Sequence, residues 1–142
     1  MLKGLDPYLT PDLLQALAQM GHGDKVALVD RNYPAYGNGG RVIDLPHADV
    51  IDVMKALLQV LPIDAFAGDP VIHMLTDDGE PGPALPACRE AWNTAEGRTV
   101  EERGVRRHGS SGFYALTRGA YVTIRTGETL PYACFLIPKG VL

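Results

Sequence analysis

Residues 10–30 read TPDLLQALAQMGHGDKVALVD, and they contain in direct succession the signals for a helix, a tight turn and a buried strand. Thr10 and Pro11 suit the cap and the first position of a helix, leucines recur at helical spacing, and Gly21 can end the helix. The segment 25–30, KVALVD, has four consecutive apolar residues between charged ones. Such a run is typical of a strand covered on both faces. A helix that leads straight into this kind of strand favours an α/β fold.

The same alternation continues through the rest of the chain. The patterns predict further helices at 48–62, 86–97 and 113–120, strands at 41–45 and 69–75, two strands within 121–142 around the turn TGETLP, and an irregular charged segment at 98–112. Because strands and helices alternate without a visible boundary, we expect one α/β domain over residues 1–142, with helices flanking a sheet.

The bulk composition limits the class of protein. A chain of 142 residues that is 46% hydrophobic is the size of one ordinary domain and can bury its own core. Its mild net charge of -4 argues against nucleic acid or an anionic membrane as a partner, because both would require clustered Lys and Arg. No segment approaches the roughly 20 apolar residues that span a bilayer.

The cysteines, the histidines and the missing motifs bear on cofactors. Cys88 and Cys134 lack the spacing of a metal site, so we expect two reduced thiols in a cytoplasmic protein. The four histidines are scattered in the same way. The chain has no phosphate-binding loop, no dinucleotide fingerprint and no nucleophile elbow. We therefore expect neither a metal nor another cofactor.

His22 lies between two glycines, where the predicted helix meets the predicted strand. One interpretation is structural, because the helix dipole favours an imidazolium near the end of a helix. The other is functional: Gly21 and Gly23 add no side-chain bulk, so a ligand can come close, and histidine is suited to proton transfer near neutral pH. The residues alone leave both interpretations open.

Asp30 ends the apolar strand and also has two interpretations. Aspartate readily caps the turn that follows a strand. Alternatively, open α/β sheets bind ligands beyond the carboxyl ends of their strands, where a carboxylate can accept hydrogen bonds from the hydroxyls of a sugar or alcohol. Both interpretations stay open at this point.

Three segments then carry a family resemblance. Residues 1–35, which include MGHGD and the later Asp30 and PA, closely resemble the amino-terminal third of L-fucose mutarotases, and residues 113–142 resemble the end of the same family. The segment 124–133, IRTGETLPYA, is equally similar to the related D-ribose pyranases, and 61–74, LPIDAFAGDPVIHM, fits the mutarotase branch. Residues 77–110 show little resemblance.

The resemblance implies a small cytoplasmic isomerase with a ribose pyranase-like α/β fold. It would interconvert the anomers or ring forms of a free, L-fucose-like monosaccharide by acid–base ring opening, without a cofactor or metal. Family members assemble into closed rings or decamers, which implies a homo-oligomer with sites at subunit interfaces. By the same resemblance, His22 is the proton donor, Asp30 is a sugar-binding carboxylate, and Tyr132, Ala133 and Cys134 form a sugar-binding tripeptide.

Two positions depart from the family pattern. Cys134 stands where the family has asparagine, which removes an amide able to donate and accept hydrogen bonds. The family's arginine or histidine before the Phe–Tyr pair falls at Ser110 by an ungapped count, although Arg107 or His108 could take its place if the loop is shifted. These departures keep an alternative open: a non-catalytic monosaccharide-binding protein associated with sugar uptake.

The spacing of the two main candidates has a geometric consequence. If 25–30 is a straight strand, His22 and Asp30 lie at its opposite ends, roughly 17 Å or more apart at ~3.3 Å per residue. One monosaccharide cannot bridge that distance. Either the strand is shorter than predicted, or different subunits contribute the two residues to one site. We favour the second hypothesis, because it would explain why the family assembles into rings.

Overall fold

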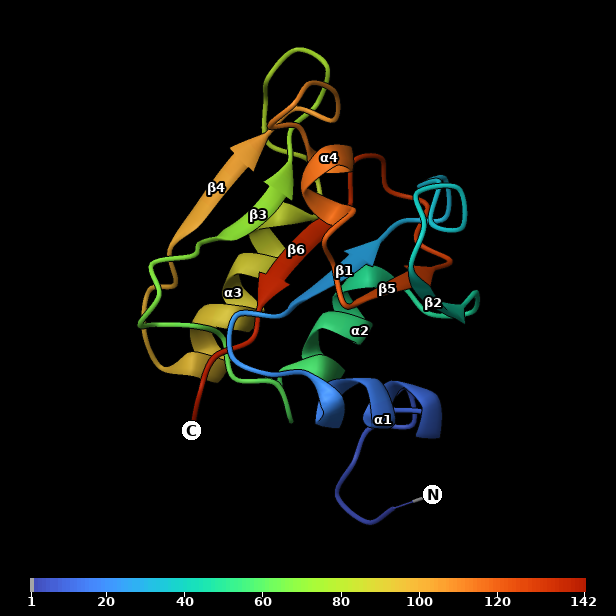
Figure 1. Ribbon diagram of the computed structural model, residues 1–142, viewed down its shortest axis with the longest axis vertical. Helices are drawn as coiled ribbons and strands as arrows, with labels where there is room; N and C mark the ends of the chain where they lie inside the picture. Colours follow the sequence, from blue (N-terminus) through green and yellow to red (C-terminus); the bar gives the residue numbers. More distant parts are fainter. Residues whose placement is uncertain (1) are drawn as a thin grey trace.

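A six-stranded mixed sheet forms the centre of the molecule, and the computed structural model describes residues 2–142 (Figure 1). In chain order the elements are α1 (Pro11–Gln19), β1 (Lys25–Val29), β2 (Arg41–Leu45), α2 (Val50–Leu57), β3 (Val71–Met74), α3 (Leu85–Glu96), β4 (Glu102–Val105), α4 (Phe113–Thr117), β5 (Val122–Thr126) and β6 (Phe135–Pro138). The predicted α/β class with helices flanking a sheet is confirmed.

The strand order is β2-β5-β1-β6-β3-β4, and β6 is the strand that runs against its neighbours. The remaining pairs are parallel, so the arrow of β6 in Figure 1 opposes those of β3 and β4. The ends of β1 to β5 and the beginning of β6 therefore meet at one end of the sheet, here called the carboxyl end. The beginnings of β1, β3 and β4 and the exit of β6 meet at the opposite, amino end.

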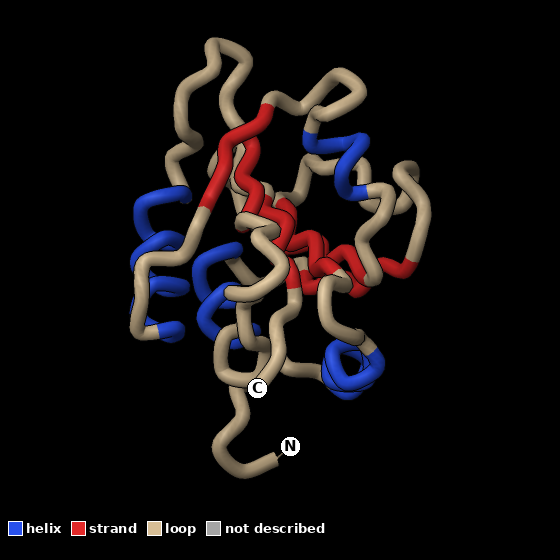
Figure 2. The backbone as a smooth tube through the Cα atoms, turned by 60° about the vertical axis from the view of Figure 1, so that its left-hand side comes forward, coloured by secondary structure: helices blue, strands red, loops and turns tan. Residues whose placement is uncertain are grey.

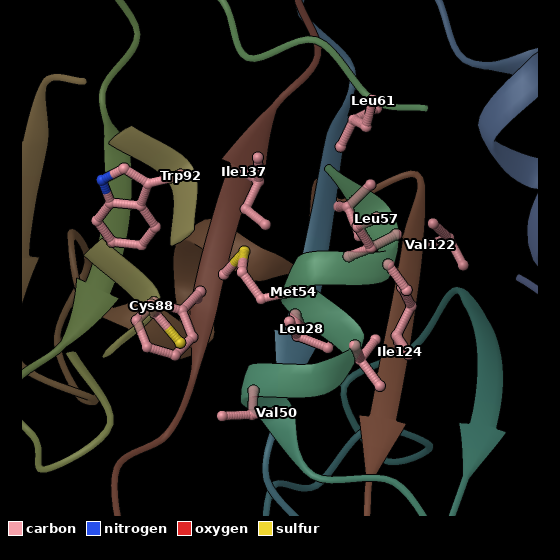
Figure 3. Packing of buried hydrophobic residues seen from close by; sticks show 14 of the residues in the cluster. Leu28, Val50, Met54, Leu57, Leu61, Cys88, Trp92, Val122, Ile124 and Ile137 are labelled. Atoms are coloured by element: carbon pink, nitrogen blue, oxygen red, sulfur yellow. The ribbon is translucent and has the colours of Figure 1, made fainter. Parts of the chain in front are cut away.

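Helices cover both faces of the sheet (Figure 2). Helices α1, α2 and α3 pack on one face, where their apolar residues join Leu28, Ile124 and Ile137 in the larger core cluster. Helix α4 lies on the other face, where its Phe113 joins Ala27 and Val29 in a smaller cluster. Figure 3 shows the larger cluster, with α2 and α3 side chains directed at the strands. Burial on both faces explains why β1 has no polar alternation.

Helix α1 begins as predicted but ends differently. Thr10 caps it by accepting a hydrogen bond from the Leu13 amide at 3.3 Å. After Gln19 the chain leaves the helix through an extended Met20, and Gly21 does not take the left-handed conformation of a glycine stop. The expectation that Gly21 ends the helix is therefore wrong. Instead, the Lys139 ammonium donates to the carbonyls of Leu17, in the last turn of the helix, and of Met20, just after it.

Other boundaries also differ from the predictions. The segment 98–112 is not wholly irregular, because β4 lies within it as an edge strand paired in parallel with β3. The two predicted strands of 121–142 are present as β5 and β6, but β1 lies between them in the sheet. Helix α2 ends at Leu57, before the predicted stop at Pro62. Within residues 2–142 no helix is long and apolar enough to cross a membrane.

Candidate functional site

A pocket of about 220 Å³ opens at the carboxyl end of the sheet. It gathers three of the residues predicted from the sequence, Asp30, Tyr132 and Cys134, from the end of β1 and the start of β6. The complete lining is Asp30, Asn32, Tyr33, Met74, Arg107, Tyr114, Pro131, Tyr132 and Cys134. The lining therefore combines a carboxylate, a guanidinium, a thiol and three phenols, which can bind a small molecule rich in hydroxyl groups.

Asp30 caps the turn after β1 and also lines the pocket. Its Oδ1 accepts hydrogen bonds from the amides of Asn32 at 2.9 Å and Tyr33 at 3.0 Å, which shapes the turn after β1. The residue is buried, with 6% of its surface exposed, and it also lines the pocket. Oδ2 faces Cys134 at 3.5 Å. A single carboxylate thus shapes the loop and presents an acceptor at the pocket wall.

Tyr132 has a positive φ of 57°, and it is the only non-glycine residue with positive φ in the part of the chain that the structure describes. Non-glycine residues in this region are uncommon and gather at functional sites. Gly82 packs against it: a Cβ at Gly82 would lie 3.1 Å from the Tyr132 carbonyl oxygen and 3.3 Å from its Cβ. The turn before α3 therefore packs closely against the backbone of Tyr132.

Cys134 is fully enclosed at the base of the pocket, with 1% of its surface exposed. Burial, aided by the Asp30 charge, raises the pKa of Cys134 well above its usual value. The protonated thiol therefore donates its hydrogen to Asp30 Oδ2. Ala133 is buried in the larger core cluster and does not line the pocket.

Arg107, and not Ser110, reaches the pocket from the loop after β4. Ser110 is exposed and is absent from the lining, and His108 is also exposed but stacks edge-on with Tyr114 at a ring separation of 5.4 Å. Arg107 binds Asp77 through Nη2 at 2.8 Å, whereas its Nε is buried and has no hydrogen-bond partner among residues 2–142. The Arg107 guanidinium thus brings a positive charge to the pocket lining.

Tyr33 and Tyr114, two of the three tyrosines in the pocket lining, differ in how far their hydroxyls are engaged. Burial raises the pKa of Tyr33, whose hydroxyl already bonds Thr117 and accepts from Asn38 at 2.9 Å. Burial also raises the pKa of Tyr114, and the positive charge of Arg107 opposes that change. Both phenols therefore stay protonated at neutral pH, and Tyr33 serves mainly to hold the loop after β1.

His22 lies outside this pocket, at the amino end of the sheet. Its side chain is 41% exposed, so the ring is open to solvent. Its Nε2 lies 2.8 Å from Oδ1 of Asp64, a carboxylate whose side chain is 1% exposed. The hydrogen bond from His22 lowers the pKa of Asp64, burial opposes this effect, and the Phe66 and Ala67 amides reinforce it.

The turn that carries His22 is attached to the exit of β6. The Gly23 amide donates to the Lys139 carbonyl at 2.9 Å, and the Lys139 amide donates to the Asp24 carbonyl at 2.8 Å. Gly23 has a φ of +85°, which explains the need for glycine after the histidine. Gly21 has no such need, but its amide donates to Asp24 Oδ2 at 2.7 Å. His22 thus lies on a short, well-anchored turn.

The predictions from sequence missed Asp64 as a neighbour of His22, and they named Arg107 only as a substitute for Ser110. Asp64 lies inside the quoted segment 61–74, but a carboxylate 42 positions from His22 gives no local sign of the contact. Arg107 follows β4, whose existence the charged sequence hid. A correct prediction of β4 could have indicated Arg107, because ligands bind beyond the carboxyl ends of parallel strands.

Comparison with known proteins defines the class first. The fold matches the fucose mutarotase of Streptococcus pneumoniae, solved with L-fucose, at a TM-score of 0.90 and 27% identity, covering 99% of each chain. It also matches Bacillus subtilis RbsD, solved with D-ribose, at a TM-score of 0.73 and 25% identity over 100% of this chain and 99% of that one. The fold of this chain is thus that of small proteins that were solved with a monosaccharide bound.

The relationship in sequence is more specific. The L-fucose mutarotase of Histophilus somni strain 2336 is 33% identical over 145 residues, covering 99% of this chain and 97% of its own length. A family model described as the RbsD / FucU transport protein family matches residues 3–142. This chain belongs to the RbsD / FucU family.

Proposed function

We propose that this protein is a monosaccharide mutarotase, an isomerase that interconverts the anomers of a free, L-fucose-like sugar in the cytoplasm. The observation that carries the proposal is the convergence of Asp30, Arg107, Tyr132 and Cys134 on one small polar pocket. The relatives reported above, an L-fucose mutarotase and a fucose mutarotase bound to L-fucose, support the same reaction.

The pocket supplies the groups that hold hydroxyls. Asp30 can accept hydrogen bonds, the Arg107 guanidinium can donate them, and Tyr132 offers a phenol and an aromatic face. In this proposal Arg107, and not Ser110, has the role of the family's arginine or histidine before the Phe–Tyr pair. Since none of these groups needs to change its covalent state, their task is to fix the sugar while its ring opens.

Ring opening requires one acid and one base. In this proposal the His22 imidazolium gives its proton to the ring oxygen, which keeps the electron pair of the breaking bond to the anomeric carbon. The anomeric hydroxyl loses its proton to water, and its oxygen forms the carbonyl double bond. After the carbonyl group rotates, the reverse steps close the ring on the other face. One positioned acid–base group contributes about 10²–10⁴-fold.

The proposal requires two subunits for each site. His22 precedes β1 and Asp30 follows it, so the length of the strand, roughly 13 Å over four residue steps, separates them within one chain. His22 is open to solvent on its own chain, which leaves it available to a second copy. We therefore propose a homo-oligomeric ring in which the exposed His22 of one subunit completes the Asp30 pocket of another.

Exchange NMR of L-fucose, D-ribose and D-galactose tests the function. We expect the wild-type protein to accelerate anomer exchange of at least one sugar, and His22→Gln to lose about 10²-fold or more of this rate. Glutamine keeps a donor for Asp64 but has no nitrogen that titrates near neutral pH. An unchanged melting temperature in His22→Gln would show that the lost exchange rate is not caused by unfolding.

A second candidate function is a non-catalytic monosaccharide-binding protein associated with sugar uptake. The enclosed thiol of Cys134 favours it, because it replaces a family amide that would contact the sugar. The same NMR experiment distinguishes the two. Saturation transfer to a bound sugar without faster anomer exchange supports binding alone, whereas faster exchange that depends on His22 supports the mutarotase.

A further inference from the structure

Two loops extend beyond the carboxyl end of the sheet, one after β3 and one after β4 (Figure 1). The loop after β4 brings Arg107 to the pocket. The loop after β3 carries Asp77, whose Oδ2 accepts a hydrogen bond from Arg107 Nη2 at 2.8 Å. We propose that Asp77, which does not itself line the pocket, is a positioning residue that holds the Arg107 guanidinium in the orientation that binds the sugar. This inference rests on the proposed function and deepens it.

The exposure of this ion pair argues against a role in stability. The side chain of Arg107 is 39% exposed and that of Asp77 is 56% exposed. A pair so open to water contributes little to folding, because water screens its charges and two flexible side chains lose freedom when they meet. Such a pair can still select one of the many rotamers of an arginine. Its main effect is therefore on the orientation of Arg107.

Asp77 lies on a turn that is closed by several hydrogen bonds. The Thr76 amide donates to the Glu80 carbonyl at 2.8 Å, and the Glu80 amide donates to Thr76 Oγ1 at 3.1 Å. At the base of the turn, Leu75 and Pro81 form an antiparallel bridge. Because the backbone on both sides of Asp77 is tied together, its carboxylate is presented to Arg107 from a defined position.

The backbone of Arg107 is held by the start of α4. The Tyr114 amide donates to the Arg107 carbonyl at 3.1 Å, and the Phe113 amide donates to the Arg106 carbonyl at 2.8 Å. Burial raises the pKa of Tyr114, and the charge of Arg107 opposes this change, so the guanidinium lies close to the Tyr114 phenol in the pocket lining. With its backbone fixed by α4 and its Nη2 fixed by Asp77, the side chain of Arg107 is held at both ends.

An arginine that is already oriented favours binding. A sugar that meets it does not have to order that side chain, and this saving in entropy increases the affinity. The orientation is the same for the bound sugar and for the transition state. We therefore expect the loss of Asp77 to raise the Kd and KM of the sugar and to leave kcat unchanged.

Asp77→Asn tests the proposal, and Asp78→Asn is the matched control. Both variants remove one negative charge from the same exposed turn, but within residues 2–142 the partner of Arg107 is Asp77. We expect Asp77→Asn to raise the Kd and KM of L-fucose roughly 2- to 5-fold, the range of exposed ion pairs, with kcat unchanged. Asp78→Asn should bind as the wild type does. Isothermal titration calorimetry measures Kd, and exchange NMR measures kcat and KM.

Two further variants show whether the effect passes through Arg107. Asp77→Glu keeps the carboxylate and should recover most of the affinity. In an Arg107→Gln background, Asp77→Asn should cause no additional loss, because the group that it positions is absent.

A third measurement needs no sugar. The Nε of Arg107 is buried, so its hydrogen should exchange slowly with water while Asp77 holds the guanidinium. We expect this exchange to be faster in Asp77→Asn and unchanged in Asp78→Asn. NMR of ¹⁵N-labelled arginine side chains measures the rate, and Arg107→Gln identifies the signal.

Three results would overturn the positioning role: wild-type affinity in Asp77→Asn, an equal loss of affinity in Asp78→Asn, or a loss that persists in the Arg107→Gln background. A wild-type protein that binds none of the sugars and accelerates the exchange of none would instead overturn the proposed function. In that case the hydrogen exchange of Arg107 Nε still decides whether Asp77 holds the guanidinium.

Discussion

The residues at the start of β6 combine backbone strain with an unusual side chain. Tyr132 adopts a left-handed conformation that costs a non-glycine residue about 1–2 kcal/mol. Two positions later, the buried thiol of Cys134 donates to Asp30 Oδ2. The strained backbone places the phenol in the pocket lining, and the thiol occupies one hydrogen-bonding position of the Asp30 carboxylate.

Restoring the amide should therefore strengthen binding. We expect Cys134→Asn to bind L-fucose more tightly by about 1 kcal/mol, which is roughly fivefold in Kd, because the amide can both donate to and accept from sugar hydroxyls. Isothermal titration calorimetry measures the change. Cys88→Ala is the control. Cys88 lies on α3 and is buried in the hydrophobic core, so this variant should lose stability but keep its affinity for the sugar. Equal or weaker binding by Cys134→Asn would mean that the thiol suits a different sugar.

At the scale of elements, the turn Thr126–Gly127–Glu128 joins β5, β1 and α2. Thr126 Oγ1 donates to the Val29 carbonyl at 2.9 Å, and the Glu128 carboxylate accepts from the Val50 amide, at the first turn of α2, at 3.2 Å. The motif TGE thus holds together the elements behind Asp30. Part of the family signature in this sequence is explained by packing and not by contact with a sugar.

Gly127 has no space for a side chain in this turn. A Cβ there would lie 2.1 Å from the Pro46 carbonyl oxygen, so the backbone would have to move. We expect Gly127→Ala to lower the free energy of unfolding by about 1–3 kcal/mol, the usual cost of overpacking. Urea unfolding measures it. In the control Gly119→Ala, the nearest atom would be 3.9 Å from the new Cβ, and a change beyond about 0.5 kcal/mol in this control would contradict the steric argument.

At the scale of the whole molecule, one strand separates the two halves of the proposed site. Asp30 and its pocket lie at the carboxyl end of the sheet, and His22 with Asp64 lies at the amino end. No rearrangement of side chains can bring these ends together, because β1 is buried and paired on both sides. Catalysis by both residues therefore requires a second subunit.

Complementation between inactive variants tests this requirement. When His22→Gln and Asp30→Asn chains are co-expressed, random assembly places an intact His22 beside an intact Asp30 in about a quarter of the sites of a closed ring. We expect the mixture to recover about that fraction of the wild-type exchange rate, although neither variant is active alone. Size-exclusion chromatography with light scattering confirms that mixed assemblies form. No recovery from a confirmed mixed assembly would mean that each chain carries a complete site.

Local sequence patterns determined the elements with strong periodicity or capping signals. Thr10 and the buried run of β1 behave as predicted, because caps and apolar periodicity act over a few neighbouring residues. The α/β class follows from their order. His22 and Asp30 were also identified from the sequence as candidates, partly from their flanking residues and partly from the family resemblance.

Tertiary structure alone decided the strand β4, the separation of β5 from β6 by β1, and the pairing of His22 with Asp64. The charged residues 102–105 form a strand because the edge of the sheet offers them a partner in β3, which no local pattern records. In the same way, Arg107 replaces Ser110 at the pocket because β4 sets where the chain turns. Contacts between distant segments depend on how the sheet is ordered, and that order is set by the packing of the whole chain.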